Sequence, residues 1–461
     1  MQKNEVRTVR IEKLAGDMGL GHVDGMTVFV KNALPGETVE ARVEKVQKNC
    51  AFLKTLRIQT PSDDRAEPRC PIYWQCGGCQ TQHMRYALSL EMKRQEVQNV
   101  QERIGGIHLP VPPVIGMDDP WHYRNKISLP IGPGPALGYF APRSHRLIPV
   151  ENCLIARENS NRLLPAVLGW IRENHIPVYD ETTGGGLLRH LMIRENREGK
   201  MMVVLVSKEP PPALDKLVDA LKAFPALHSV HLNLNSDRGN VILGQKTTVL
   251  YGPERMRDTL CGLHFDLSPL SFFQVNPVQT EKLYTLAVGF AELTGNETVC
   301  DLYCGAGTIS LLLAKRARRV IGIEEVAPAV LDAKHNAALN GIDNADFIAA
   351  KAEEALPALV SDGLKPDVIV LDPPRKGCEE KVLQAISACA PERVVYVACD
   401  PATQARDLKI LTGLGYAAMR TQCVDMFCQT KHVETVCLLY HQKKDFIFVP
   451  YEPKDAEYLK K

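Results

Sequence analysis

The chain has 461 residues, of which 45% are hydrophobic and 24% charged, and its formal net charge is +1 at pH 7. This length predicts roughly two to four domains of ordinary globular composition. A nearly neutral chain excludes a protein that binds nucleic acid through a global positive field, so contact with RNA or DNA requires local basic surfaces.

The absence of targeting segments predicts a cytoplasmic protein. No apolar stretch reaches the roughly 18 residues of a membrane span, and the N-terminal residues MQKNEVRTVRIEK lack the apolar core of a signal peptide. A reducing cytoplasm disfavours disulfides. The 14 cysteines are therefore expected to be metal ligands, a nucleophile or plain core residues.

Residues 1–60 consist of short alternating segments separated by glycines, which predicts a small β-barrel. They carry ten Lys and Arg against seven Asp and Glu, a net charge of +3. A linker-like segment, PSDDRAEPRCP (61–71), follows. Residues 84–104 have helical periodicity, and residues 120–250 are rich in strand patterns, so an α+β domain is expected next.

Four cysteines in this middle region form a candidate metal site. Cys70, Cys76 and Cys79 lie in CPIYWQCGGCQ, and Cys153 follows in VENCLIA. Four thiolates can hold zinc or an iron–sulfur cluster. Zinc ribbons usually pair two Cys-x2-Cys knuckles, so the asymmetric spacing here favours a 4Fe-4S cluster. Four unliganded core cysteines would be unusual in so polar and Gly-rich a loop.

From about residue 280 onward strands and helices alternate, which is typical of a doubly wound parallel sheet. VCDLYCGAGTISLLLA (299–314) is a strand, a Gly-rich turn at Gly305 and Gly307, and a helix. The next strand ends at Glu324, where a carboxylate can accept hydrogen bonds from ribose hydroxyls. The third glycine of the NAD-binding pattern is missing, so S-adenosylmethionine is the favoured ligand.

Two further strands end in residues suited to chemistry. Asp372 precedes two prolines, and Cys399 closes the strand VVYVA, so both are expected at the carboxyl edge of the sheet. A thiolate that adds to carbon 6 of uracil makes carbon 5 nucleophilic enough to accept a methyl group. A general base must then remove the proton from carbon 5.

Four ordered motifs resemble the RNA uracil-5-methyltransferases, and the likeness is closest to bacterial enzymes that form 5-methyluridine in 23S ribosomal RNA. The motifs are DLYCGAGT (301–308), VLDPPRKG (370–377), YVACDPATQARD (396–407) and VDMFCQTKHVETVCLL (424–439). The resemblance implies that Cys399 is the nucleophile and Glu434 the base. It implies that S-adenosylmethionine is bound by Gln274, Tyr303, Glu324 and Asp372, and that a 4Fe-4S cluster is held by Cys70, Cys76, Cys79 and Cys153.

The chain departs from the family at Asp400, where members often have Asn after the catalytic cysteine. An anionic Asp400 that faced the thiol would raise the pKa of Cys399. The resemblance further implies three domains: a TRAM barrel that binds RNA (1–60), a central α+β iron–sulfur domain (61–255) and a Rossmann-like methyltransferase domain (256–461).

The expected function is transfer of a methyl group from S-adenosylmethionine to carbon 5 of a flipped uridine in 23S ribosomal RNA, by a monomer. Basic and aromatic residues at 121–130 and 143–147 are typical of RNA contacts, or of a solvated surface. Two alternatives stay open. One is a transfer RNA uridine-5-methyltransferase, and the other is a non-catalytic iron–sulfur RNA-binding protein.

Overall fold

The computed structural model describes residues 1–442, so the tail 443–461 of the expected methyltransferase domain lies outside the described residues. The first 60 residues form the predicted barrel, closed in the order β1-β2-β3-β5-β4. Alternate apolar side chains such as Val28 and Val30 fill its interior, while their neighbours face solvent. Its strands are β1 (Val6–Ala15), β2 (Met18–Val23), β3 (Met26–Lys31), β4 (Thr38–Val46) and β5 (Cys50–Thr60).

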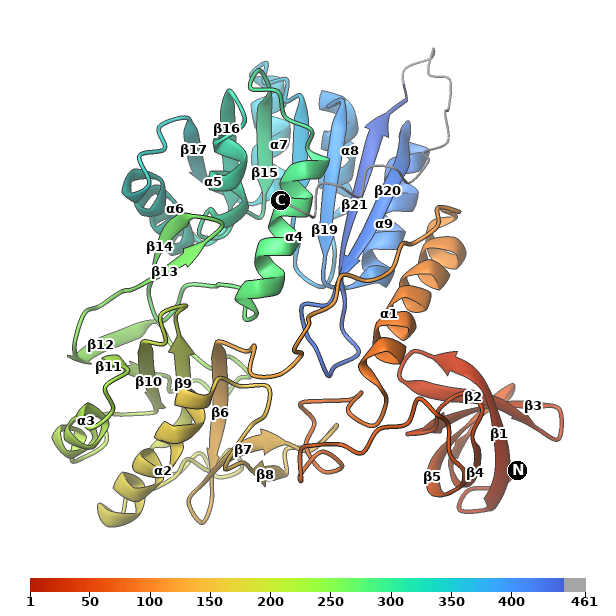
Figure 1. The fold of residues 1–461 in the computed structure, drawn as a ribbon. Helices are drawn as coiled ribbons and strands as arrows, with labels where there is room; N and C mark the ends of the chain where they lie inside the picture. The colour runs from red at the N-terminus through yellow and green to blue at the C-terminus, as the bar shows by residue number, and fades with distance from the viewer. Residues whose placement is uncertain (443–461) are drawn as a thin grey trace.

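The segment after the barrel is docked rather than free. Arg65 makes a two-pronged ion pair with the buried Glu37, with contacts of 2.5 and 2.8 Å. Helix α1 (Tyr86–Val100) and the π-helical turn η1 (Gln101–Gly105) confirm the predicted helix. Figure 1 shows α1 (orange) between the barrel and the last strands of the C-terminal sheet.

The middle of the chain forms a seven-stranded sheet in the order β12-β11-β10-β9-β6-β7-β8. Helices α2 (Glu158–Glu173) and α3 (Leu214–Lys222) pack on one face, where they bury apolar side chains such as Leu163 and Leu217. The strands are β6 (Lys126–Gly132), β7 (Ala136–Phe140), β8 (Leu147–Pro149), β9 (Leu188–Glu195), β10 (Met201–Ser207), β11 (Leu227–Leu234) and β12 (Lys246–Tyr251).

The hairpin β13 (Met256–Leu260) and β14 (Leu263–Leu267) leads into α4 (Pro277–Phe290) and the C-terminal sheet, whose order is β17-β16-β15-β18-β19-β21-β20. The first five strands are parallel, and β21 runs antiparallel between β19 and β20. The strands are β15 (Thr298–Leu302), β16 (Arg319–Glu324), β17 (Ala345–Ala349), β18 (Val368–Leu371), β19 (Arg393–Ala398), β20 (Tyr416–Val424) and β21 (Glu434–His441). The helices are α5 (Thr308–Ala314), α6 (Ala327–Leu339), α7 (Ala352–Ser361), α8 (Glu380–Cys389) and α9 (Pro401–Gly413).

This topology confirms the predicted doubly wound methyltransferase fold. Separate apolar cores lie on the two faces of the sheet. The strand order reverses at β15, which lies between β16 and β18, and ligands of open α/β folds bind outside the carboxyl ends at such a point. Gly307 is required at the turn there, because its φ is +80° and a Cβ would lie 3.1 Å from Ala333.

Candidate active site

The predicted catalytic residues meet at one edge of the C-terminal sheet. Asp372 and Cys399 directly follow the parallel neighbours β18 and β19, so their strands deliver them to the same edge. Strand β21 starts at this edge because it is antiparallel, and its pairing of Thr435 with Ala398 brings Glu434 level with Cys399. The fold therefore brings together a thiol and two carboxyl groups that are distant in the sequence.

The two carboxyl groups hold their protons unusually tightly. Glu434 is 3% exposed, and burial, reinforced by the nearby Asp372, raises the pKa of Glu434 to about 8, although Arg375 opposes the shift. Burial of the carboxyl group raises the pKa of Asp372 to about 7. A carboxylate whose pKa lies near neutrality is a strong enough base to remove a proton from carbon and is still partly ionised at pH 7–8.

The thiol of Cys399 needs help to ionise. Burial raises the pKa of Cys399 to about 11, and Glu434 and Asp372 add to this effect. Arg375 lowers the pKa of Cys399 by its charge and by a side-chain hydrogen bond. Arg375 is thus a candidate functional residue that the sequence analysis missed, although it stands directly after Asp372-Pro373-Pro374.

The sequence left open that the carboxylate of Asp400 faces the thiol of Cys399 and raises its pKa. In the structure this carboxylate has another role. It is the N-cap of α9, where Oδ1 accepts hydrogen bonds from the backbone N–H groups of Ala402 and Thr403, both at 3.0 Å. A negative charge at a helix N-terminus is favourable. Asp400 therefore does what Asn does at an N-cap, which explains the departure from the family pattern.

The residues predicted to bind S-adenosylmethionine surround the Gly-rich turn and its neighbouring strand ends. Glu324 ends β16 and accepts hydrogen bonds from the backbone N–H groups of Gly305 (3.0 Å) and Val326 (2.9 Å). Tyr303 directly follows β15 with a left-handed φ of 68°, and its side chain lies against Cys378. Both positions lie at the carboxyl ends of strands at the switch point.

Gln274 reaches the site through a tyrosine that the sequence analysis missed. Tyr284 on α4 is 3% exposed, and its side chain hydrogen bonds to Gln274 and Thr308. Burial and the nearby Asp372 and Glu434 raise the pKa of Tyr284. No motif marks this tyrosine, because only helix packing brings α4 over the sheet edge.

Asp301 supports a cationic ligand beside the turn. Its Oδ2 accepts a hydrogen bond from Ser310 at 2.5 Å, whereas within residues 1–442 its buried Oδ1 has no hydrogen-bond partner. Burial raises the pKa of Asp301 to about 7. A buried carboxylate with a vacant acceptor suits a positively charged group such as the ammonium or sulfonium of S-adenosylmethionine.

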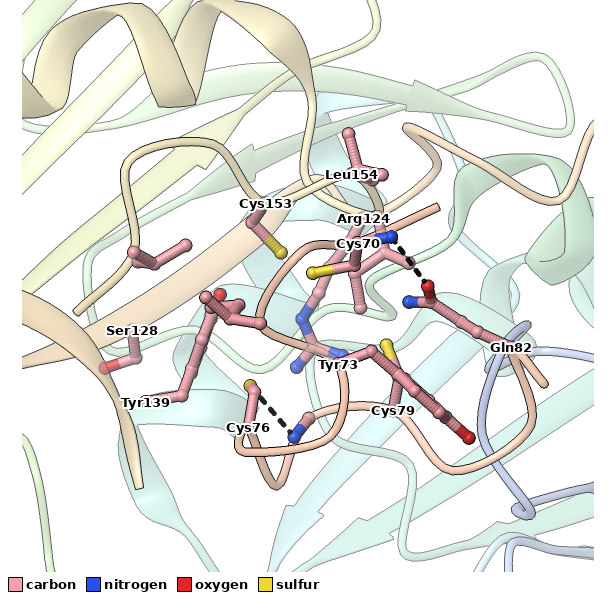
Figure 2. A pocket seen from close by; sticks show the side chains of 14 residues that line it. Cys70, Tyr73, Cys76, Cys79, Gln82, Arg124, Ser128, Tyr139, Cys153 and Leu154 are labelled. Carbon is pink, nitrogen blue, oxygen red and sulfur yellow. Dashed lines mark hydrogen bonds between the residues drawn. The ribbon is translucent and has the colours of Figure 1, made fainter. Parts of the chain in front are cut away.

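The four predicted cluster cysteines are brought together elsewhere, at the central domain. Cys70, Cys76, Cys79 and Cys153 line one cavity of about 260 Å³, and Figure 2 shows their sulfur atoms facing the same space. Burial raises the pKa of Cys79 to about 12, and the other three cysteines add to this effect.

The structure of the described residues does not show a metal site at these cysteines. Within residues 1–442 there is no group of three or more His, Cys, Asp or Glu side chains spaced to hold one metal ion. The four thiols instead line the walls of the cavity, and the 4Fe-4S cluster stays a prediction. The described residues also contain no helix long and apolar enough to cross a membrane.

The fold and the edge residues define an S-adenosylmethionine-dependent methyltransferase. Residues 261–442 match the family model of tRNA (uracil-5-)-methyltransferases, and residues 2–52 match the TRAM domain. The chain belongs to this family of RNA uracil-5-methyltransferases.

Relatives extend the similarity over nearly the whole chain. An uncharacterized RNA methyltransferase of Clostridium tetani is 46% identical over 92% of this chain and 94% of its own length. One from Halalkalibacterium halodurans is 46% identical over 95% of this chain and 98% of its own. Among solved structures, the Pyrococcus abyssi tRNA (uracil-54, C5)-methyltransferase in complex with S-adenosyl-L-homocysteine has a TM-score of 0.74 and 28% identity, covering 94% of this chain and 100% of that chain.

Proposed function

We propose that this protein methylates carbon 5 of a flipped uridine in 23S ribosomal RNA, as a cytoplasmic monomer. The observation that carries the chemistry is the thiol of Cys399 at a strand end, level with a buried Glu434 whose pKa is about 8. The choice of ribosomal RNA rests on the N-terminal barrel together with the four-cysteine cavity. The alternative substrate is transfer RNA, which the name of the Pyrococcus abyssi neighbour favours.

In the proposed mechanism Cys399, as a thiolate, adds to carbon 6 of uracil and breaks the double bond between carbons 5 and 6. Carbon 5 becomes nucleophilic and takes the methyl group that S-adenosylmethionine supplies. Glu434 then removes the proton from carbon 5, the double bond forms again, and the thiolate of Cys399 leaves. Arg375 supports both steps in which the sulfur carries negative charge, because its guanidinium favours the thiolate.

Four residues are proposed to hold the methyl donor: Gln274, Tyr303, Glu324 and Asp372. Glu324 lies at the end of the second strand of the fold, where a carboxylate binds ribose hydroxyls. Asp372, Gln274 and Glu434 all lie near the side chain of Tyr284. This arrangement supports a donor site next to the base and the nucleophile.

The cavity of the four cysteines is proposed to hold a 4Fe-4S cluster. The support for it is the set of four thiols that line one cavity. Arg124 also lines the cavity and would offset part of the negative charge of four thiolates. We assign residues 61–255 to this central domain, residues 1–60 to the RNA-binding barrel and residues 256–461 to the methyltransferase domain.

Protein purified without oxygen is expected to contain about four irons per chain, the stoichiometry of a cluster held by four cysteines. Iron and acid-labile sulfide analysis measures this directly. A Cys153→Ser variant should lose iron, whereas Cys261→Ser, at a half-buried cysteine outside the cavity, should retain it. Zinc in place of iron would rule out the cluster.

The substrate is tested by mapping 5-methyluridine in RNA from a strain that lacks this protein. We expect mass spectrometry to find one or more 5-methyluridines missing from 23S ribosomal RNA and restored by the wild-type gene. Loss from transfer RNA instead would establish the alternative substrate. Unchanged modification of both RNAs would contradict methyltransferase function.

A further inference from the structure

The loop 425–433 leads directly into Glu434 and is mostly buried, although Lys431 is exposed. It connects β20 to β21, and its two ends meet where Val424 pairs with Glu434, so the loop adjoins the first residue of β21 and can adjust the orientation of the Glu434 carboxyl group. Asp425, Met426 and Cys428 are each 0% exposed. Such a loop is positioned by whatever bonds its backbone to the rest of the molecule.

The segment that follows Cys79 supplies one such hold. The backbone N–H groups of Gln80 and Thr81 both donate to the carbonyl oxygen of Gln429, at 2.9 and 3.2 Å. Gln429 has a φ of 65°, which is left-handed and unfavourable for a residue with a side chain. A conformation of this kind persists because surrounding groups hold it in place.

A second hold comes from Tyr123, the chain neighbour of Arg124, which lines the cysteine cavity. The hydroxyl of Tyr123 donates to the carbonyl oxygen of Cys428 at 2.8 Å, and both residues are buried. Tyr123 and Cys428 share an apolar cluster with Ile155, and Cys79 and Cys153 pack against this cluster. Two cavity cysteines therefore adjoin the groups that fix the loop.

The far end of the loop is held independently by α1. Lys93 and Asp425 form an ion pair at 2.5 Å with both side chains 0% exposed, and Tyr86 donates to the same carboxylate at 2.7 Å. Hydrogen bonds within the loop connect this end to Glu434. Thr430 Oγ1 donates to Phe427 O and accepts from the backbone N–H of His432, which lies two residues before Glu434.

We propose that the segments next to the four-cysteine cavity, residues 79–81 and Tyr123, position the catalytic base. Residues 79–81 and Tyr123 hold Gln429 and Cys428, and this hold sets the geometry with which Glu434 meets the proton on carbon 5. Order in the cavity is thereby coupled to proton abstraction, and less to the donor residues Tyr303, Glu324 and Asp372, which stand at the ends of β15, β16 and β18. The inference rests on the proposed role of Glu434.

The test uses Tyr123→Phe, which removes one hydroxyl and keeps the ring. In single turnover with substrate RNA, we expect the methylated protein–RNA conjugate to decay about three- to tenfold more slowly, the effect of one lost buried hydrogen bond. Amide hydrogen exchange across 425–433 should speed up, and S-adenosylmethionine affinity should stay within about twofold of wild type. Tyr251→Phe, the same change on the edge strand β12, should match wild type in all three measurements.

Removal of iron with a chelator from the wild-type holoprotein should produce the same faster exchange in 425–433. Wild-type exchange and conjugate decay in Tyr123→Phe would overturn the proposal. If wild-type protein forms no methylated conjugate with ribosomal or transfer RNA, the proposed function fails instead. Amide exchange of the loop in wild type and in Tyr123→Phe then still decides whether Tyr123 holds the loop.

Discussion

Replacement of Cys399 by alanine is expected to abolish 5-methyluridine formation, with a fall in rate of at least about 10³-fold, because no other group can make carbon 5 nucleophilic. Cys399 is half-buried at the end of β19, and Arg375 is the cation that favours its thiolate. RNA that carries 5-fluorouridine at the target traps the intermediate, because fluorine cannot leave carbon 5 as a cation. Wild-type protein should therefore form an adduct that survives denaturing electrophoresis, and Cys399→Ala should form none.

Cys50→Ala is the matched control, since Cys50 is a half-buried cysteine in the barrel, and it should form the adduct as wild type does. An adduct that survives in Cys399→Ala would place the nucleophile elsewhere. No adduct in any variant, together with intact RNA binding, would favour the non-catalytic alternative.

Replacement of Glu434 by glutamine is expected to stop the reaction after methyl transfer. The amide cannot take the proton from carbon 5, so the thiolate of Cys399 stays bound to carbon 6 and a methylated protein–RNA conjugate accumulates. General-base removal costs about 10²- to 10⁴-fold. Gel shift under denaturing conditions and mass spectrometry of the conjugate measure the effect.

The pH dependence gives a second check on Glu434. Its pKa is raised to about 8, so the ionised, active fraction increases as the pH rises toward that value. In wild-type protein the decay of the conjugate should accelerate with pH, reach half its maximum near pH 8 and level off about one pH unit higher. The control variant Glu392→Gln, at an exposed glutamate beside Arg393, should behave as wild type does. If Glu434→Gln turns over without accumulating the conjugate, Glu434 is not the base.

Local sequence patterns were sufficient to predict the strands and helices and to place the site residues at the carboxyl edge of the C-terminal sheet. Alternation in residues 1–60 predicted the barrel because one face of each strand must be buried. Asp372 and Cys399 could be placed together because the ends of neighbouring parallel strands meet at one edge. The helix over 84–104 was also predicted correctly, although its last turn is a π-helix.

Contacts between distant segments were beyond such reasoning. Arg375 was visible in its motif, but only the folded chain shows that it faces Cys399. Tyr284 carries no sequence signal, and α4 must pack on the sheet before its side chain meets Gln274. The hydrogen bond from the backbone N–H of Gln80 to the carbonyl oxygen of Gln429 joins residues that are far apart in the sequence.

The sequence by itself determined the strands, the helices, the Gly-rich turn and the residue types available for chemistry, because these follow from periodicity and backbone preferences over a few residues. The tertiary structure decided which of those residues act together. Strand β21 enters antiparallel beside β19 and brings Glu434 level with Cys399, and burial there raises the pKa of Glu434 to about 8. Burial and long-range strand pairing are properties of the packed chain, so the base acquires its strength only when the fold is complete.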